Sequence, residues 1–119
     1  MTPHLTVQQI DKATVVEFVT PSLMDQLDLQ NISEQLFELV EKQDKRQIIM
    51  DFEKVQYLSS QAIGIVLNVN KKLGALKNSQ LILCGVGPRL MELVRITRLD
   101  RVLKIKATQK EALATINGY

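Results

Sequence analysis

Two short and almost uninterrupted apolar runs constrain the fold of this 119-residue chain more than any other feature. They are residues 47–52, with the sequence QIIMDF, and residues 81–84, with the sequence LILC. An apolar run of this length is typical of a strand that is buried on both faces. We therefore expect two buried strands, and the first is expected to end at Asp51 or Phe52.

Two further strands are predicted before the first of these runs. Residues 5–10 and 14–19 alternate apolar with polar side chains, which is the periodicity of a strand with one buried face. Asp11 and Lys12 lie between them and supply a turn. We expect the two strands to form a hairpin, with Pro21 ending the second strand.

Apolar residues at spacings of three and four predict helices between and after the strands. The expected starting points are about Asp28, Ser60, Pro88 and Thr108. Thr108 and Glu111 form a capping box, and a last strand is expected over residues 102–105. The predicted order ββαβαβαβα gives one α/β domain over residues 1–119, with a mixed four- to five-stranded sheet and about four helices.

Residues 55–70 contain no charged side chain, which is unusual for a surface region. Apolar residues at helical spacing favour a helix from Ser60 to about Lys77, although several β-branched residues in this stretch also suit a strand. The predicted inward stripe consists of Ile63, Val66, Leu67, Asn70, Leu73 and Leu76. Either Ser59 or Ser60 is suited to cap this helix.

The cysteine and histidine content excludes several kinds of chemistry. Cys84 is the only cysteine and His4 the only histidine, so neither an internal disulfide, nor a four-ligand zinc site, nor a histidine triad is expected. Cys84 lies in an apolar run and is interpreted as a buried side chain. We expect neither a secretory signal nor a transmembrane segment, because the first residues lack a basic start with an apolar run and no stretch has about 18 uncharged apolar residues. We expect a cytoplasmic protein with no cofactor, no metal and no histidine-based catalysis, while catalysis by carboxylates stays open at this point.

Charge is unevenly placed along the chain. Residues 1–70 hold five basic and ten acidic side chains, a balance of −5, whereas residues 71–119 hold ten basic and three acidic side chains, a balance of +7. The basic half lacks the aromatic partners of a nucleic-acid surface. We interpret it as a solvated face or a docking surface for an acidic protein, without direct nucleic-acid binding.

A glycine pair after the second apolar run resembles part of a dinucleotide fingerprint. Gly85 and Gly87 follow a predicted strand and precede a predicted helix, but Leu90 occupies the place of the third glycine. No acidic residue lies about twenty residues further on. The pair is therefore interpreted as a structural turn.

Two adjacent hydroxyls, those of Ser59 and Ser60, stand where the second helix is expected to begin. One reading is a structural cap, which is worth about 1 kcal/mol. The other is a phosphorylation switch, because the positive end of a helix and its unpaired N–H groups favour a phosphate. The spacing of the serines alone leaves both readings open.

Two patterns in register make the chain resemble a known family. They are IIMDFxxVxxLSSxxIG over residues 48–64 and GVGPxLxxLxxIxxL over residues 85–99. Together they resemble the STAS domain family of anti-sigma factor antagonists, and the resemblance covers essentially the whole chain. The resemblance implies that the chain is a bacterial regulator of transcription, which acts by binding other proteins and catalyses no reaction of its own.

The resemblance also implies partners and a site. Members of this kind bind an anti-sigma factor that is also a serine protein kinase, and so release the sigma factor. The kinase phosphorylates a serine at the start of the second helix, which abolishes binding, and a phosphatase restores it. The family's acceptor maps onto Ser60, with Ser59 as the fallback. The expected partner-binding residues are Tyr57, Leu58, Ser59, Ser60, Gln61 and Ile65.

The chain departs from the family pattern on both sides of the serines. Leu58 replaces an aspartate before them and Gln61 replaces a glycine after them. Residues 19–25 also lack the family's usual Gly-x-Leu-Asp turn. These departures favour an alternative, in which the chain is a non-phosphorylated STAS scaffold subunit of a stress-signalling or transporter complex.

Overall fold

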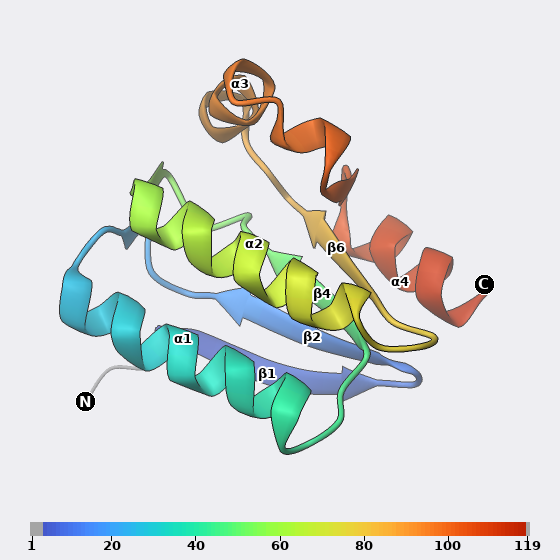
Figure 1. The fold of residues 1–119 in the computed structure, drawn as a ribbon. Coiled ribbons are helices and arrows are strands. Elements are labelled where there is room, and N and C mark those ends of the chain that lie inside the picture. Colours follow the sequence, from blue (N-terminus) through green and yellow to red (C-terminus); the bar gives the residue numbers. More distant parts are fainter. Residues whose placement is uncertain (1–3, 119) are drawn as a thin grey trace.

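The first two strands form the predicted hairpin at one edge of the sheet (Figure 1). In the computed structural model, which describes residues 4–118, β1 (Leu5–Ile10) pairs antiparallel with β2 (Ala13–Phe18). Asp11 in the turn has a φ of 52°, a left-handed conformation that aspartate tolerates better than most residues. The side chains in the middle of β1 are exposed, whereas those of β2 are largely buried.

The two apolar runs are central strands of the sheet, as predicted. The strand order is β1-β2-β4-β6-β7, and β4 (Gln47–Asp51), β6 (Gln80–Cys84) and β7 (Lys104–Lys106) run parallel to β2. Ile49 pairs with Ile82, and both side chains have an exposed fraction of 0%. One antiparallel and three parallel pairings make this the expected mixed five-stranded sheet.

Helices cover both faces of the sheet, which explains why the central strands lack polar alternation. α1 (Gln26–Glu41) and α2 (Ser60–Gly74) lie side by side on one face, and α4 (Gln109–Asn117) covers the other (Figure 1). Ile48 and Met50 belong to the main core beneath α1 and α2, while Ile49 points into a smaller cluster with Ala112 of α4.

Several boundaries differ from those predicted. α1 begins at Gln26, earlier than expected, because the Asp25 side chain accepts hydrogen bonds from the N–H groups of Leu27 and Asp28. α2 ends at Gly74 rather than near Lys77. The predicted start of α3 (Pro88–Ile96) at Pro88 is confirmed.

The predicted last strand over residues 102–105 is displaced. A 3₁₀ turn, η1 (Leu99–Arg101), follows α3, and Val102 is its exposed C-cap, so β7 begins only at Lys104. The Thr108 side chain caps α4 by accepting from the N–H of Glu111 at 3.1 Å. The Glu111 carboxylate accepts from the N–H of Ala107 rather than from that of Thr108, so the capping box is displaced by one residue.

The buried face of α2 is rotated relative to the predicted stripe. Its buried side chains are those of Ala62, Ile65, Val66, Val69 and Leu73, whereas Ile63 and Leu67 are half-buried. Ile65, expected at the surface, has an exposed fraction of 8% and lies in the main core. Apolar residues lie on two adjacent stripes of this helix, so the sequence pattern alone does not decide which stripe faces the core.

Candidate functional site

A second, two-stranded sheet positions the start of α2. β3 (Ser22–Leu23) pairs parallel with β5 (Tyr57–Leu58), and neither strand was predicted. The carbonyl of Pro21 accepts hydrogen bonds from the N–H groups of Gln56 and Tyr57 at 2.7 and 3.1 Å. Strands of two residues are too short for a periodic pattern, so only the three-dimensional pairing reveals them.

The two adjacent serines have different structural roles. Ser59 is the N-cap of α2, and its side-chain oxygen accepts a hydrogen bond from the N–H of Ala62 at 3.1 Å. Its own N–H donates to the carbonyl of Leu23 at 3.1 Å. Ser60 is the first helical residue, and its side chain is exposed. The structural cap is therefore Ser59, which leaves the hydroxyl of Ser60 accessible.

The remaining predicted partner-binding residues divide into exposed and buried ones. Tyr57 has an exposed fraction of 46%, and Gln61 is also exposed. Leu58 is half-buried and packs against the main core, opposite Leu23 in the β3–β5 register. Ile65 points inward, so it does not contribute to the accessible surface.

Three exposed side chains near this site were not predicted from the sequence. Met24 and Leu27 have exposed fractions of 54% and 73%, and the first turns of α1 and α2 lie at the same end of the molecule (Figure 1). The Arg89 guanidinium lies over the Tyr57 ring, 5.1 Å from the ring centroid, in a cation–π contact. Leu27 lies off the buried stripe of α1, which is the one signal in the sequence that could have identified it.

We refer to the exposed side chains of Met24, Leu27, Tyr57, Ser60 and Gln61 as the serine surface. None of the five is charged, so contacts with these side chains themselves remove no water from an ion, although the exposed charges of Asp25 and Arg89 border them. Three of them are large and apolar or aromatic, and side chains of this kind supply much of the binding energy of protein interfaces. The serine surface therefore has the composition of a protein-binding site.

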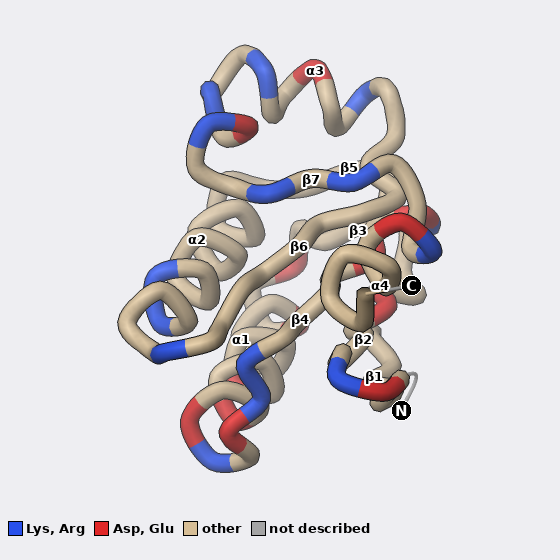
Figure 2. Tube along the Cα trace, turned by 90° about the vertical axis from the view of Figure 1, so that its right-hand side faces the viewer, with Lys and Arg blue, Asp and Glu red and all other residues tan. Residues whose placement is uncertain are grey.

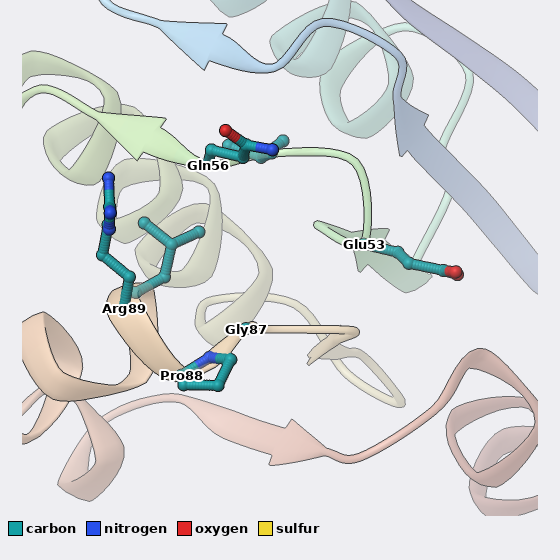
Figure 3. Close-up of a pocket in the computed structure, with 7 residues that line it drawn as sticks. Glu53, Gln56, Gly87, Pro88 and Arg89 are labelled. Carbon is teal, nitrogen blue, oxygen red and sulfur yellow. The ribbon is translucent and has the colours of Figure 1, made fainter.

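An open cleft of about 360 Å³ adjoins Tyr57 on the side of Arg89. Gly87, Pro88 and Arg89 at the start of α3 form one wall, and Glu53 and Gln56 from the loop after β4 form the other (Figure 3). The Glu53 side chain extends away from Arg89 in this view. Arg89 therefore belongs both to the wall of the cleft and, through its contact with Tyr57, to the border of the serine surface.

A buried carboxylate holds the loops behind the site. Asp51 accepts a hydrogen bond from the N–H of Glu53 at 2.9 Å and another from the Gln109 side chain at 2.8 Å. Gly85 has a φ of +67°, and a Cβ at this position would lie 2.8 Å from a carboxylate oxygen of Asp51. Gly85 is therefore required by the turn, in agreement with the structural reading of the glycine pair.

Cys84 is buried next to this carboxylate, as predicted. Burial, together with the charges of Asp51 and Glu53, raises the pKa of its thiol from 9.0 to about 12. A thiol with so high a pKa stays protonated and unreactive at neutral pH. Among residues 4–118, no three His, Cys, Asp or Glu side chains form a group that could hold a metal ion.

None of the helices formed by residues 4–118 is long and apolar enough to cross a membrane. The mixed sheet and its helices define a small α/β domain, with the serine surface at one end. The particular family follows from the match of residues 4–112 to the STAS domain, and the chain belongs to the STAS domain family.

Solved structures share this fold at low sequence identity. The chain is similar to an anti-sigma-factor antagonist (STAS) domain protein from Planctomyces limnophilus, with 22% identity, coverage of 98% of this chain and 99% of that one, and a TM-score of 0.85. It is similar to the Bacillus cell fate determinant SpoIIAA in the phosphorylated form, with 19% identity, coverage of 94% and 98%, and a TM-score of 0.73.

A third structure of the same fold comes from a different kind of protein. It is a sulfate transporter family protein from Wolinella succinogenes, with 13% identity, coverage of 91% of this chain and 87% of that one, and a TM-score of 0.72. At these identities the three structures establish the fold of the chain and leave its partners to be argued from its own residues.

Proposed function

We propose that this chain is an anti-sigma factor antagonist whose binding is controlled by phosphorylation. In this proposal the serine surface binds an anti-sigma factor that is also a serine protein kinase, and binding releases the sigma factor. Phosphorylation of Ser60 ends the binding, and a phosphatase restores it. The chain catalyses no reaction itself and acts in the cytoplasm as a regulator of transcription.

The observation that carries this proposal is the division of roles between the two serines. The Ser59 hydroxyl is committed to capping α2, whereas Ser60 is exposed among the other uncharged side chains of the serine surface. Modification of Ser60 leaves the cap intact, so it changes the surface and not the fold. Membership of the STAS family and the similarity to antagonists of anti-sigma factors support the same partner class.

The physical basis of the switch is the cost of burying a new charge. A phosphate on Ser60 adds about −1.5 to −2 charges at the centre of the serine surface. The positive end of α2 and its free N–H groups stabilise this charge in the unbound protein. A partner that covers an uncharged surface must desolvate the phosphate, which costs several kcal/mol, and each 1.4 kcal/mol lowers affinity about tenfold.

The first test maps the modification site. The protein is incubated with ATP and a serine kinase anti-sigma factor from the same cell, and its intact mass and modified residue are determined. We expect one phosphate on Ser60, its loss in Ser60→Ala, and its retention in Ser59→Ala. An unmodified wild-type protein, or equal modification of the wild type and Ser60→Ala, contradicts the assignment.

The second test measures binding to the same kinase. Ser60→Glu places a negative charge on the serine surface, and we expect it to weaken binding at least about tenfold while the thermal midpoint stays within a few degrees. Thr115→Glu is the matched control, because Thr115 is an exposed hydroxyl residue on α4, on the opposite face of the sheet. Equal binding by Ser60→Glu and the control would remove the serine surface from the interface.

A second function is favoured by one residue. Leu58 stands where the family has an aspartate, and its side chain packs against the core, so no carboxylate precedes the serines. The alternative is a STAS scaffold subunit of a stress-signalling or transporter complex that works without phosphorylation. The similarity to a sulfate transporter family protein supports this alternative. Partner binding that is unaffected by Ser60→Glu, together with no phosphate uptake, identifies it.

A further inference from the structure

The segment from the start of α3 to the start of α4 is strongly basic. Residues 89–110 hold seven basic and two acidic side chains, a balance of +5. Arg95, Arg98, Arg101 and Lys104 are all exposed, and we refer to these four side chains as the basic end. Among residues 4–118, no carboxylate lies within ion-pair distance of any of them.

Arg98 follows the end of α3 and has a left-handed backbone conformation. Arg98 has a φ of +59°, in the left-handed region that favours glycine. The other described non-glycine residues with positive φ are two aspartates and an asparagine, which tolerate this conformation better. This conformation is common directly after a helix, and it leaves the Arg98 side chain exposed beyond the end of α3.

Exposed apolar side chains accompany these cations. Ile96 and Val102 have exposed fractions of 73% and 60%, and each is adjacent in sequence to an arginine of the basic end. Apolar contacts bordered by arginine are typical of protein interfaces. The basic end, with exposed apolar side chains beside its arginines, therefore resembles a docking surface in composition and not a uniformly solvated face.

A surface of matching negative charge is present on α1 of the same chain. Residues 25–44 hold six acidic side chains and one basic, and three of the six, Asp28, Glu41 and Asp44, lie within ion-pair distance of His4, Lys72 and Arg46. Glu34 and Glu38 are exposed one helical turn apart, and neither is in ion-pair distance of a described cation. Like charges at this spacing destabilise a helix unless another group compensates them. The half-buried ring of Phe37 lies next to Glu38 in the sequence.

The two charged surfaces cannot meet within one molecule. Figure 2 places α3 and β7 at one end of the molecule and α1 at the other, with α2 between them. We propose that the basic end of one copy docks on the acidic face of α1 of a second copy. This contact uses different surfaces on the two copies, so it is a head-to-tail contact that continues into short chains or rings.

The net charge of the chain permits this association. With a net charge of only +2, two copies repel each other weakly, while the four cations of the basic end face the unpaired carboxylates of Glu34 and Glu38 on the second copy. Glu34, Glu38 and the basic end include no residue of the serine surface. Because the contact is between charges, self-association is expected to depend on salt. Because the contact does not include Ser60, self-association is expected to be independent of phosphorylation at Ser60.

Sedimentation of the purified protein tests this contact. Between about 10 µM and about 1 mM at low salt we expect the average mass to rise with concentration, and to fall back to the monomer at about 0.5 M salt, where charges are screened. The double variant Arg98→Glu with Arg101→Glu removes the basic end, and we expect its self-association to be at least about tenfold weaker.

A matched control separates this contact from a general effect of charge. Lys12→Glu with Lys77→Glu gives the same net charge as the arginine variant, because both reverse two cations, but it changes exposed lysines in two turns elsewhere. We expect this control to associate like the wild type. A second variant, Glu34→Lys with Glu38→Lys, is expected to associate poorly alone and to associate with the arginine variant when the two are mixed.

Each of the following outcomes overturns the proposal. The first is a wild-type protein that stays monomeric over the whole concentration range at low salt. The second is equal loss of association in the arginine variant and the lysine control. The third is association that persists in the arginine variant, or a mixture of the two complementary variants that stays monomeric. A monomeric protein whose basic end instead binds duplex DNA would reassign this surface to nucleic acid.

Discussion

The separate roles of the two serines predict that replacing them has different effects on stability. Ser59→Ala removes the side-chain oxygen that caps α2, whereas Ser60→Ala removes an exposed hydroxyl from the first position of the helix. The two changes delete the same atom from neighbouring residues. Any difference between them therefore reports the local structure and not the chemistry of the substitution.

The magnitude follows from the hydrogen bond that is lost. Replacing an N-cap serine by alanine costs about 0.5–2 kcal/mol. Ala62, whose N–H donates to the Ser59 oxygen, has an exposed fraction of 3%, so water replaces the lost acceptor poorly. We therefore expect the upper half of the range, about 1–2 kcal/mol. Ser60→Ala is expected to change the free energy of unfolding by less than about 0.5 kcal/mol.

Urea unfolding measures the difference in free energy of unfolding directly, and thermal unfolding gives a second measure of it. For a 119-residue chain the entropy of unfolding is about 250 cal/mol/K, so a loss of 1–2 kcal/mol lowers the thermal midpoint by about 4–8 °C. Both variants are expected to keep the wild-type slope against urea, because the buried surface is unchanged. Equal losses in the two variants, or a larger loss in Ser60→Ala, would refute the assignment of Ser59 as the cap.

Two further predictions concern the support behind the site. Gly85→Ala places a Cβ 2.8 Å from an Asp51 oxygen at a residue with positive φ, so we expect the free energy of unfolding to fall by at least about 2 kcal/mol. Gly64→Ala, with open space around its Cβ, is expected to stabilise α2 by up to about 1 kcal/mol. Denaturant unfolding of both variants checks this, and equal effects would contradict it. Because the pKa of Cys84 is raised in the folded protein, its thiol stays protonated there, whereas the thiol of the unfolded chain ionises above about pH 9. The contribution of the buried Cys84 thiol to stability is therefore lost as pH rises from about 9 to about 12. The stability difference between the wild type and Cys84→Ala is expected to change by about 2 kcal/mol between pH 8 and pH 10.5, and a constant difference would contradict the shift.

Much of the fold is predictable from local sequence because each element has its own periodicity. The hairpin, the two central strands and the start of α3 at Pro88 are all found where the sequence indicates them. The resemblance to the STAS family is confirmed by the match of residues 4–112, while the order of the strands in space comes from the structure. Displaced boundaries occur where a cap or a 3₁₀ turn decides the end of an element, as at Asp25 and Val102.

The candidate site is less predictable because it is assembled from segments that are distant in the sequence. The uncharged stretch and its two serines are visible in the sequence, yet their exposure is not. Met24 and Leu27 come to the same end of the molecule as Ser60 only because β3 pairs with β5 and α1 packs beside α2. Arg89 reaches Tyr57 from a third element, the start of α3.

The sequence by itself determined the alternation of strands and helices, the family and the charge asymmetry, because each of these depends on residue types and short spacings. The tertiary structure decided which serine caps α2, that Ile65 faces the core, and that the two charged surfaces lie at opposite ends. These outcomes depend on the rotation of a helix about its axis and on pairings between distant segments. Both are set by packing of the whole chain, and a local pattern compatible with two rotations cannot choose between them.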